Sequence, residues 1–425
     1  MLDLKYIKEN ADAVRENVKN RFMSVDIDTV LALYEKRNAL IVESDALKQK
    51  RNENAKKMKG KLDQEERKVL IAEGKDLKER IAAADEELSG IKEALDREAR
   101  RVPNMAHPDA PVGKEDKDNT EIRRVGTIPE FDFHPLDHVE LGTRLDLIDF
   151  DSAAKVTGQK FYYLKNEAVF LELALSRYVM DILVSRGFTP TITPDIAREE
   201  VLEGIGFNPR GDESNIYSLE DTGTCLVGTA EITLGGMLSD RILNREDLPV
   251  KLAGLSHCFR REAGAAGQYS KGLYRVHQFT KVEMFVFCLP EDSERMHEEL
   301  LAIEEAIFSG LEIPYRVVDT CTGDLGAPAY RKFDLEAWMP GRGESGDWGE
   351  VTSTSNCTDY QARRLGIRFR DDSGNRYVHM LNGTAVAVSR ALIALLENNQ
   401  RSDGSVSIPK ALVPYTGFDT IGGRQ

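Results

Sequence analysis

Apolar residues at heptad spacing constrain the first hundred residues of this chain more than any other pattern. The first set is Leu33, Leu40 and Leu47. Two further sets lie later in the sequence and overlap each other: Leu70, Leu77, Ala84 and Ile91, and Ile81, Leu88, Leu95 and Val102. Apolar side chains that return every seven residues form the seam of a coiled coil. Between the sets, Gly60 and Asp63-Gln64-Glu65-Glu66 predict a turn and a new helix N-cap. We therefore expect an antiparallel helical hairpin whose helices of about 30 residues reach about 45 Å.

The charge of the chain is unevenly distributed. The net charge of −15 argues against a nucleic-acid partner, but residues 1–100 carry 22 basic and 22 acidic residues, so the whole excess lies in 101–425. Seven basic residues and only one acid, Glu53, lie at the end of the first predicted helix: Lys48, Lys50, Arg51, Lys56, Lys57, Lys59 and Lys61. Such a cluster is suited to contact phosphates. From the residues alone, a solvated spacer or a dimerisation device explains the hairpin equally well.

Composition places the chain among globular proteins of two or three domains. It has 425 residues, 41% of them apolar and 30% charged. No apolar run approaches the roughly 18 residues of a membrane-spanning helix, and the N-terminus has no secretory or transit-peptide pattern. The five cysteines lie at least 30 residues apart. We expect an intracellular protein, in the cytoplasm or as a processed organellar form, with reduced thiols and no structural zinc.

A break after the hairpin predicts the domain organisation. Prolines and a glycine interrupt the helix between Val102 and Gly113, and 114–119 is a charge-dense connector. We expect a helical arm at 1–105, a linker at 106–130 and a second domain at 131–425, in which short strands alternate with helices. Within it, 168–186 has helical spacing and leads into a strand that ends at Pro194.

The segment from Phe259 to Glu283 carries the strongest chemical signal. It places a cation, a glycine-rich loop, an aromatic ring and a carboxylate along a predicted strand, loop and strand: Phe259-Arg260-Arg261-Glu262-Ala263-Gly264-Ala265-Ala266-Gly267, then Val276-His277-Gln278-Phe279-Thr280-Lys281-Val282-Glu283. This arrangement suits a nucleotide and an amino acid bound together. Gly267 and Gly272 have the spacing of a P-loop, but Leu273-Tyr274 follows instead of Lys-Ser/Thr. Kinase-like and dinucleotide-binding folds are therefore not supported.

Three further segments carry polar groups where strands and helices are expected. Gly349-Glu350-Val351-Thr352-Ser353-Thr354-Ser355-Asn356 offers oxygen ligands for divalent cations and ATP, although a polar, half-buried strand has the same pattern. The segment 382–392 joins a strand of small residues to a helix with one arginine, Arg390. Thr229-Ala230-Glu231 is by itself an ordinary tripeptide.

Together these segments resemble the seryl-tRNA synthetases of the bacterial and organellar type. The segment 259–283 is similar to motif 2 of that class II family, 349–356 to its G-E-(V/I)-S-S-x-S-N, 382–392 to motif 3, and 168–194 to motif 1, its dimer-interface element. Motif 3 usually reads N-G-S-G-L-A-V-G-R, and here Thr384, Ala385 and Ser389 replace Ser, Gly and Gly. Thr384 keeps a hydroxyl, whereas Ala385 and Ser389 put the width of the pocket in doubt.

The resemblance implies a fold and a function. The fold is α+β, with an antiparallel α-helical coiled-coil arm followed by a class II antiparallel β-sheet flanked by helices, in a homodimer. The implied enzyme is a serine–tRNA ligase, which activates L-serine with ATP and Mg²⁺ to seryl-adenylate. It then transfers serine to the 3′ end of tRNA(Ser), and also of tRNA(Sec), while the arm grips the long variable arm of the tRNA.

The resemblance also assigns roles to residues. Arg260, Arg390 and Glu350 are the catalytic set. The ATP-binding set is Arg260, Arg261, Glu262, Val276, Phe279, Glu350, Val351, Thr352, Ser353 and Arg390, with no separate role for Arg261. The serine-binding set is Thr229, Ala230, Glu231, Arg260, Glu283 and Thr384. The Mg²⁺ ligands are Glu350 and Ser353. The tRNA-binding set is Lys48, Arg51, Lys56, Lys57, Lys59 and Lys61.

In these roles each group is expected to meet a particular part of a substrate. Arg260 bridges the serine carboxylate and the α-phosphate. On the nucleotide, Glu262 accepts from the adenine amino group, Phe279 stacks on the base, Val276 contacts it through the backbone, and Arg390 neutralises the γ-phosphate. Glu231 pairs with the serine ammonium, while Glu283 and Thr384 bind its hydroxyl.

Two other functions remain to be distinguished. A catalytically silent relative would bind tRNA through the arm alone, and the intact Arg260, Glu283 and Arg390 argue against it. A ligase that loads an amino acid onto a carrier protein would share the catalytic fold but lack the arm. Serine-dependent exchange of pyrophosphate into ATP separates the first of these rivals from the expected enzyme.

Overall fold

The computed structural model describes residues 1–61, 63–207, 215–263, 269–372 and 374–422. They divide into two compact units, Met1–Pro103 and Asn104–Gln425. Each unit is described by itself. Among the described residues no helix is both long and apolar enough to cross a membrane.

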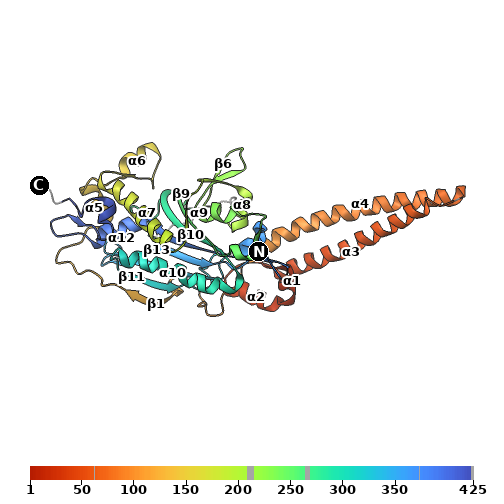
Figure 1. Ribbon diagram of the computed structural model, residues 1–425, viewed down its shortest axis with the longest axis horizontal. Helices are drawn as coiled ribbons and strands as arrows, with labels where there is room; N and C mark the ends of the chain where they lie inside the picture. The colour runs from red at the N-terminus through yellow and green to blue at the C-terminus, as the bar shows by residue number, and fades with distance from the viewer. Residues whose placement is uncertain (62, 208–214, 264–268, 373, 423–425) are drawn as a thin grey trace. The chain divides into compact units, whose positions relative to one another are not determined.

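The first unit is a helical hairpin with a small helical base. It contains α1 (Leu4–Glu9), α2 (Ala11–Asn20), α3 (Ile27–Lys57) and α4 (Gln64–Arg101). The long helices α3 and α4 lie side by side (Figure 1). The Asp63 side chain accepts hydrogen bonds from the backbone of Glu65 and Glu66, and the backbone N–H of Asp63 donates to the Glu66 carboxylate, which confirms the predicted N-cap as a capping box.

The predicted heptad seam is confirmed by burial. Leu40 and Leu47 on α3 are buried, as are Leu77, Ile81, Ala84, Leu88 and Leu95 on α4, while Leu33, Leu70 and Ile91 are half-buried. Two polar residues interrupt the seam. Ser44 donates to Asp85 at 2.7 Å, and Asn54 donates to the carbonyl of Leu70 at 3.1 Å. Partly buried polar pairs of this kind can fix the register of a coiled coil.

The basic cluster lies at the end of α3 and in the turn that follows. Lys50, Arg51, Lys56, Lys57, Lys59 and Lys61 are exposed. Lys48 differs from them, since it forms an ion pair with Asp85 at 2.9 Å. Among the ion pairs of the described residues, Lys48 is thus the predicted phosphate contact that already pairs with a carboxylate of α4.

The second unit is built on an eight-stranded sheet. Its order is β1 (Thr120–Val125), β11 (Tyr315–Asp319), β12 (Arg331–Met339), β13 (Asp347–Asn356), β16 (His379–Ala387), β10 (Gln278–Cys288), β9 (Val250–Phe259) and β4 (Thr189–Ile192). All neighbours are antiparallel except β4 and β9. The strand β1 falls inside the range predicted as a linker, so part of that range is an edge strand of the sheet.

Each face of the sheet carries its own apolar core. The larger core includes α7 (Glu167–Ser185), α10 (Ser293–Gly310) and α12 (Val388–Asn398), and the smaller one includes α8 (Glu199–Ile205), α9 (Ala230–Gly236) and α11 (Tyr360–Leu365). Strand β10 serves both, since Met284 and Val286 belong to the larger core and Phe285 and Phe287 to the smaller. This is the α+β architecture expected from the sequence.

The remaining helices and strands of this unit are short, and their strands form four small sheets in the described part of the chain. They are α5 (His138–Arg144), β2 (Ile148–Asp149), α6 (Phe150–Val156), β3 (Tyr163–Leu164), β5 (Ile196–Arg198), β6 (Tyr217–Leu219), β7 (Thr224–Leu226), β8 (Ile242–Asn244), β14 (Arg368–Asp371), β15 (Gly374–Tyr377), β17 (Val406–Ser407), α13 (Val413–Thr416) and β18 (Thr420–Ile421). All five cysteines are buried as free thiols.

Candidate functional site

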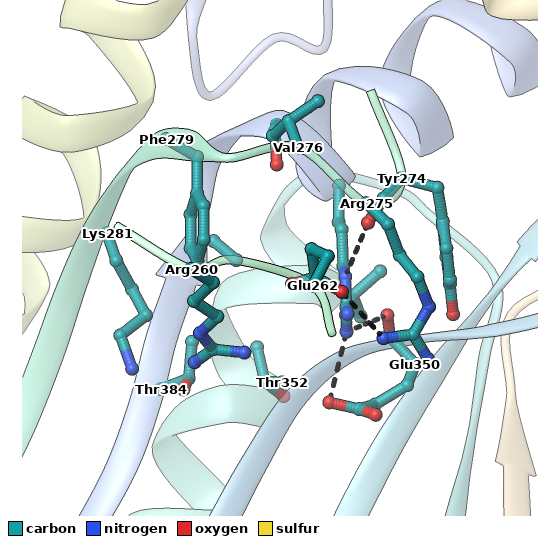
Figure 2. A pocket seen from close by; sticks show the side chains of 14 residues that line it. Arg260, Glu262, Tyr274, Arg275, Val276, Phe279, Lys281, Glu350, Thr352 and Thr384 are labelled. Atoms are coloured by element: carbon teal, nitrogen blue, oxygen red, sulfur yellow. Dashed lines mark hydrogen bonds and ion pairs between the residues drawn. The ribbon is translucent and has the colours of Figure 1, made fainter. Parts of the chain in front are cut away.

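The sheet alternation places a polar pocket beside the smaller core. Going from Phe287 and Phe285 toward the start of β10, the same face continues through Glu283, Lys281 and Phe279. The pocket is lined by Arg260, Glu262, Tyr274, Arg275, Val276, Phe279, Lys281, Glu350, Val351, Thr352, Thr384, Ala387, Ser389 and Arg390. Figure 2 shows Arg260, Phe279, Lys281 and Thr384 at one end of it, and Glu262, Arg275 and Glu350 at the other.

Arg260 is fixed at the point where β9 ends. Its backbone N–H donates to the carbonyl of His277 at 2.9 Å, and His277 Nδ1 lies 2.8 Å from the carbonyl of Arg260. The guanidinium donates through Nε to the carbonyl of Gly228 at 3.2 Å and lies 5.4 Å from the centre of the Phe279 ring. No described residue hydrogen-bonds the other nitrogens of this side chain, so they can meet an anion beside an aromatic face.

Glu262 occupies the first turn of the loop after β9. It adopts a φ of 48°, and its carboxylate pairs with Arg275 Nη1 at 3.3 Å. Val276, two positions before β10, is buried at 2% exposure. Arg261 is exposed, and its N–H donates to the carbonyl of Asn215 away from the pocket lining. The glycine-rich part of the predicted motif, 264–267, lies outside the described residues.

A chain of buried polar contacts runs beneath the Arg260 end of the pocket. Lys281 forms an ion pair with Glu283 and donates to the hydroxyl of Thr229 at 2.7 Å. The hydroxyl of Thr384 lies 3.5 Å from Glu283 Oε2. Lys281 and Glu283 are 5% and 2% exposed. A buried carboxylate with a matched cation holds a fixed charge that a small hydroxylated ligand could meet.

Glu231 lies at the start of α9, capped by the side chain of Thr229. Gln361 Nε2 donates to Glu231 Oε1 at 2.8 Å. Burial raises the pKa of the Glu231 carboxyl to about 7, and the nearby Glu283 adds to the shift. The adjoining Ala230 is fully buried in the smaller core. A cationic group brought to this point would restore the ionised form of Glu231.

Arg390 and Glu350 close the other end of the pocket. Arg390, on the first turn of α12, donates through Nη1 to the carbonyl of Glu350 and to its Oε1, both at 3.0 Å (Figure 2). Loss of solvent raises the pKa of Glu350, but the charges of Arg390, Lys332 and Arg260 outweigh this and lower it overall. Glu350 is thus held as a carboxylate among three cations.

A β-bulge explains how Glu350 and Ser353 come to share a face. Residues three apart on a regular strand point to opposite sides, but the pairing of β12 with β13 shifts by one residue at Val351. Glu350 consequently pairs with Glu336, and Ser353 with Asp334, while Val351 packs in the larger core and also lines the pocket. Ser353 donates its hydroxyl to Asp334 and does not line the pocket among the described residues.

A second bulge answers the question raised by the replacements in motif 3. The pairing of β10 with β16 runs from Val282–Val386 to Glu283–Thr384, so Ala385 is the extra residue. Ala385 and Val386 both pack in the larger core, on the face opposite the pocket. The methyl group of Ala385 therefore does not narrow the pocket. Ser389, in contrast, lines it.

Several pocket residues carry no role in the sequence analysis. They are Lys281, Tyr274, Arg275 and Ser389 in the lining, and Gln361 behind it. Lys281 was detectable, because Phe279, Lys281 and Glu283 alternate along one strand. Gln361 carried no such signal, since only tertiary packing brings α11 next to Glu231. Asp334 likewise emerges from the strand pairing, and burial raises its pKa to about 6.

Comparison with known families adds independent findings. Residues 1–106 match the family described as "Seryl-tRNA synthetase N-terminal domain", and 217–399 match "tRNA synthetase class II core domain (G, H, P, S and T)". A serine–tRNA ligase of Treponema denticola is 65% identical over 423 residues, which is 99% of this chain and 100% of the relative. The serine–tRNA ligase of Rubrobacter xylanophilus is 59% identical over 99% of both chains.

A solved structure agrees with the sequence relatives. The crystal structure of seryl-tRNA synthetase from Pyrococcus horikoshii, complexed with ATP, superposes with a TM-score of 0.93 at 42% identity and covers 100% of both chains. The similarity thus extends over the hairpin and the sheet domain alike.

Proposed function

The chain belongs to the seryl-tRNA synthetase family, and from that membership we propose how its own residues carry out the reaction of a serine–tRNA ligase. The enzyme is a class II aminoacyl-tRNA synthetase that uses ATP. In the first step the serine carboxylate attacks the α-phosphorus in line, which forms seryl-adenylate and expels pyrophosphate. In the second, a ribose hydroxyl at the tRNA 3′ end attacks the acyl carbon and releases AMP.

The observation that carries the proposed mechanism is the arrangement of fixed cations along the pocket. Arg260 lies at one end, against Phe279, and Arg390 lies at the other, against Glu350. A nucleotide stacked on Phe279 would extend its phosphates between the two guanidinium groups. Neither arginine needs to move far to neutralise charge that develops on the phosphates, and such preorganised electrostatics supplies most of the catalysis in phosphoryl-transfer chemistry.

Mg²⁺ fits the residues at the Arg390 end. Glu350 stays ionised there, and the bulge brings the Ser353 hydroxyl to the same face of β13. Hard oxygen donors of this kind suit Mg²⁺, which would neutralise phosphate charge when bound with ATP. Glu350 and Ser353 would hold it, while Arg390 keeps its contact with the backbone carbonyl of Glu350.

Serine would occupy the buried polar chain next to Arg260. Its ammonium would pair with Glu231, whose pKa is raised by burial and by the nearby Glu283. Its hydroxyl would meet Glu283 and Thr384, which already lie in contact. Thr229 and Ala230 position Glu231 at the start of α9. Glu283 is paired with Lys281, so that an amino acid without a hydroxyl would leave the buried carboxylate without its third polar partner.

The hairpin would bind tRNA(Ser) through its long variable arm. Six basic residues at its end are exposed and have no acidic partner in the described ion pairs: Lys50, Arg51, Lys56, Lys57, Lys59 and Lys61. The rest of the chain carries the whole negative excess. An isolated basic surface on an acidic protein directs a polyanion to one place. Acceptance of tRNA(Sec) would use the same surface.

A homodimer is supported by the segment that resembles motif 1. Large apolar side chains of α7 and β4 are exposed in the single chain: Val169 at 40%, Phe170 at 55%, Leu173 at 62% and Ile192 at 82%. Apolar surface of this extent marks an interaction site in a globular protein. Sedimentation of the purified chain should give twice the mass of 47.6 kDa.

Serine-dependent exchange of labelled pyrophosphate into ATP tests the proposed function. The purified chain should catalyse exchange with serine and not with alanine or threonine, and it should charge tRNA(Ser). Exchange that is absent with serine, or equal with all three amino acids, would refute the proposal.

A further inference from the structure

A buried histidine joins two elements of the pocket without facing it. His138 and Glu397 are both 0% exposed, and His138 Nδ1 lies 2.8 Å from Glu397 Oε1. The backbone N–H of Leu273 approaches His138 Nε2 at 3.1 Å. Since a backbone N–H can only donate, Nε2 must be the unprotonated nitrogen. The proton therefore sits on Nδ1 and is donated to Glu397.

Glu397 is held as firmly as the histidine. Its Oε1 also accepts from the backbone N–H of His138 at 2.9 Å, and its Oε2 accepts from the N–H of Gly341 at 2.8 Å. Three donors thus fix the carboxylate. A carboxylate so fixed sets the tautomer and the ring orientation of the histidine that donates to it.

These contacts connect α12 to residues 269–277, the segment that leads into β10 and forms the return limb of the loop. Glu397 follows Arg390 by seven residues on α12, which is two helical turns and brings both to nearly the same side of the helix. Arg390 Nε approaches the carbonyl of Tyr274 at 3.4 Å, and its guanidinium lies 4.7 Å from the centre of the Tyr274 ring. The helix therefore contacts Tyr274 directly and its neighbour Leu273 through His138.

At two glycines the backbone passes very close to His138 and Glu397. A Cβ on Gly272, which has a φ of +56°, would lie 2.1 Å from His138 Nε2. A Cβ on Gly341 would lie 2.9 Å from Glu397 Oε1. The backbone passes the histidine and the carboxylate at distances that exclude any side chain at both positions.

We propose that His138 and Glu397 are positioning residues of the adenylation reaction. They hold Leu273 and Tyr274 against α12, and Tyr274 in turn holds the guanidinium of Arg390 at the phosphate end of the pocket. Neither of the two touches a substrate. The proposal rests on the proposed function, because it concerns how tightly ATP and its transition state are held.

The two isosteric replacements of histidine separate the proposed role from a general loss of stability. A glutamine at 138 offers an acceptor near the position of Nε2, so His138→Gln should keep the Leu273 contact and remain within about threefold of wild type in KM for ATP. An asparagine offers a donor near the position of Nδ1 only. His138→Asn leaves the Leu273 N–H unpaired, and its KM for ATP should rise by about tenfold, equivalent to about 1.4 kcal/mol. The KM for serine should not change in either.

A matched control uses a histidine elsewhere. His379 is half-buried and lies 2.9 Å from the hydroxyl of Ser293, away from the pocket lining. His379→Asn should leave both KM values unchanged. The proposal would be overturned if His138→Asn and His138→Gln had the same KM for ATP. It would also be overturned if His138→Asn raised the KM for serine as much as the KM for ATP. Both criteria hold whatever the melting temperatures of the variants.

A backbone variant provides a second and independent test. Gly272→Ala should displace the return limb from His138 and raise the KM for ATP as His138→Asn does. Gly417 has a φ of +78° with nothing within 4 Å of an added Cβ, so Gly417→Ala carries the backbone strain without the collision. Gly272→Ala with the kinetics of Gly417→Ala would overturn the proposal. Failure of the proposed function itself is recognised separately, since wild-type protein would then show no serine-dependent exchange.

Discussion

Arg390 donates through a single nitrogen, Nη1, to both the carboxylate and the backbone carbonyl of Glu350, each at 3.0 Å. The carbonyl contact keeps the guanidinium in place even if the carboxylate turns toward another cation. Glu350 would help to hold Mg²⁺, which would neutralise phosphate charge when bound with ATP, and Arg390 would meet a phosphate from its place on the Glu350 carbonyl.

The first prediction concerns the two arginines. Arg260→Ala and Arg390→Ala each remove a cation from phosphate charge that moves during adenylation, so the loss should appear mainly in turnover, on the order of 10²–10³-fold. Serine-dependent pyrophosphate exchange measures it. Arg261→Ala is the matched control, because Arg261 is exposed and is not among the described residues that line the pocket. Unchanged exchange in either active-site variant would mean that its role is misassigned.

The second prediction concerns selection of serine. Wild-type enzyme should reject alanine by a factor on the order of 10⁴, because Glu283 would otherwise be left without its hydroxyl partner. Glu283→Ala should severely lower activation of serine and leave the affinity for ATP near normal. The KM values for serine and ATP, measured by exchange, separate the two effects. Serine activation close to wild type in this variant contradicts the assignment of the hydroxyl site.

The third prediction concerns pH. Glu231 must be ionised to pair with the serine ammonium, and its pKa of about 7 lies above the ordinary value. Below pH 7 most molecules carry the neutral acid, and above it the carboxylate. The KM for serine should therefore fall as the pH rises from 6 to 8, while the KM for ATP follows a different profile. Glu231→Gln should raise the KM for serine and abolish this dependence, and a retained dependence would point to another group.

The fourth prediction concerns the basic cluster. Replacing Lys56, Lys57, Lys59 and Lys61 by glutamine should weaken tRNA binding and flatten its salt dependence, with each lost phosphate contact reducing the log–log slope by roughly 0.7 to 0.9. Pyrophosphate exchange should hardly change. The same replacements at Lys75 and Lys78, exposed on α4, serve as the control. Charging of tRNA at full efficiency with the cluster removed would favour the spacer interpretation of the hairpin.

The fifth prediction concerns the boundary between the units. Asn104 is 3% exposed and donates to the carbonyls of Pro328 and Cys357 at 2.9 and 3.0 Å. The fragment 104–425 should fold and catalyse exchange. The fragment 106–425, cut where the sequence analysis ends the arm, should be less stable by about 1–3 kcal/mol because those buried acceptors lose their donor. Thermal unfolding of the two fragments compares them, and equal melting temperatures would contradict the anchoring role.

The features that the sequence predicts well are local ones. The hairpin follows from heptads and from an N-cap at Asp63, both of which depend on residues a few positions apart. The sheet domain followed from resemblance over long motifs rather than from periodicity. The strand β1 escaped prediction because half of its six residues, Thr120–Val125, are charged and nearly all are exposed, as edge strands commonly are.

The partners of the site residues were the least predictable part. Glu231 with Gln361 and Glu262 with Arg275 are pairs that the chain brings together only through folding. Neither partner lies at a spacing that marks it. The effect of Ala385 on the pocket was left open by the sequence, and in the structure Ala385 packs in the larger core and is not among the described residues that line the pocket.

The two bulges, at Val351 and at Ala385, determine on which face of the sheet each side chain of β13 and β16 lies. The one extra residue of each bulge places residues before and after it on the same face of the sheet. These are Glu350 and Ser353 on β13, and Thr384 and Ala387 on β16. A single deletion just outside either bulge would invert every side chain up to the next irregularity while leaving composition and hydropathy almost untouched. We therefore expect that relatives which keep the sheet but have lost the activity differ by one-residue gaps in these two strands.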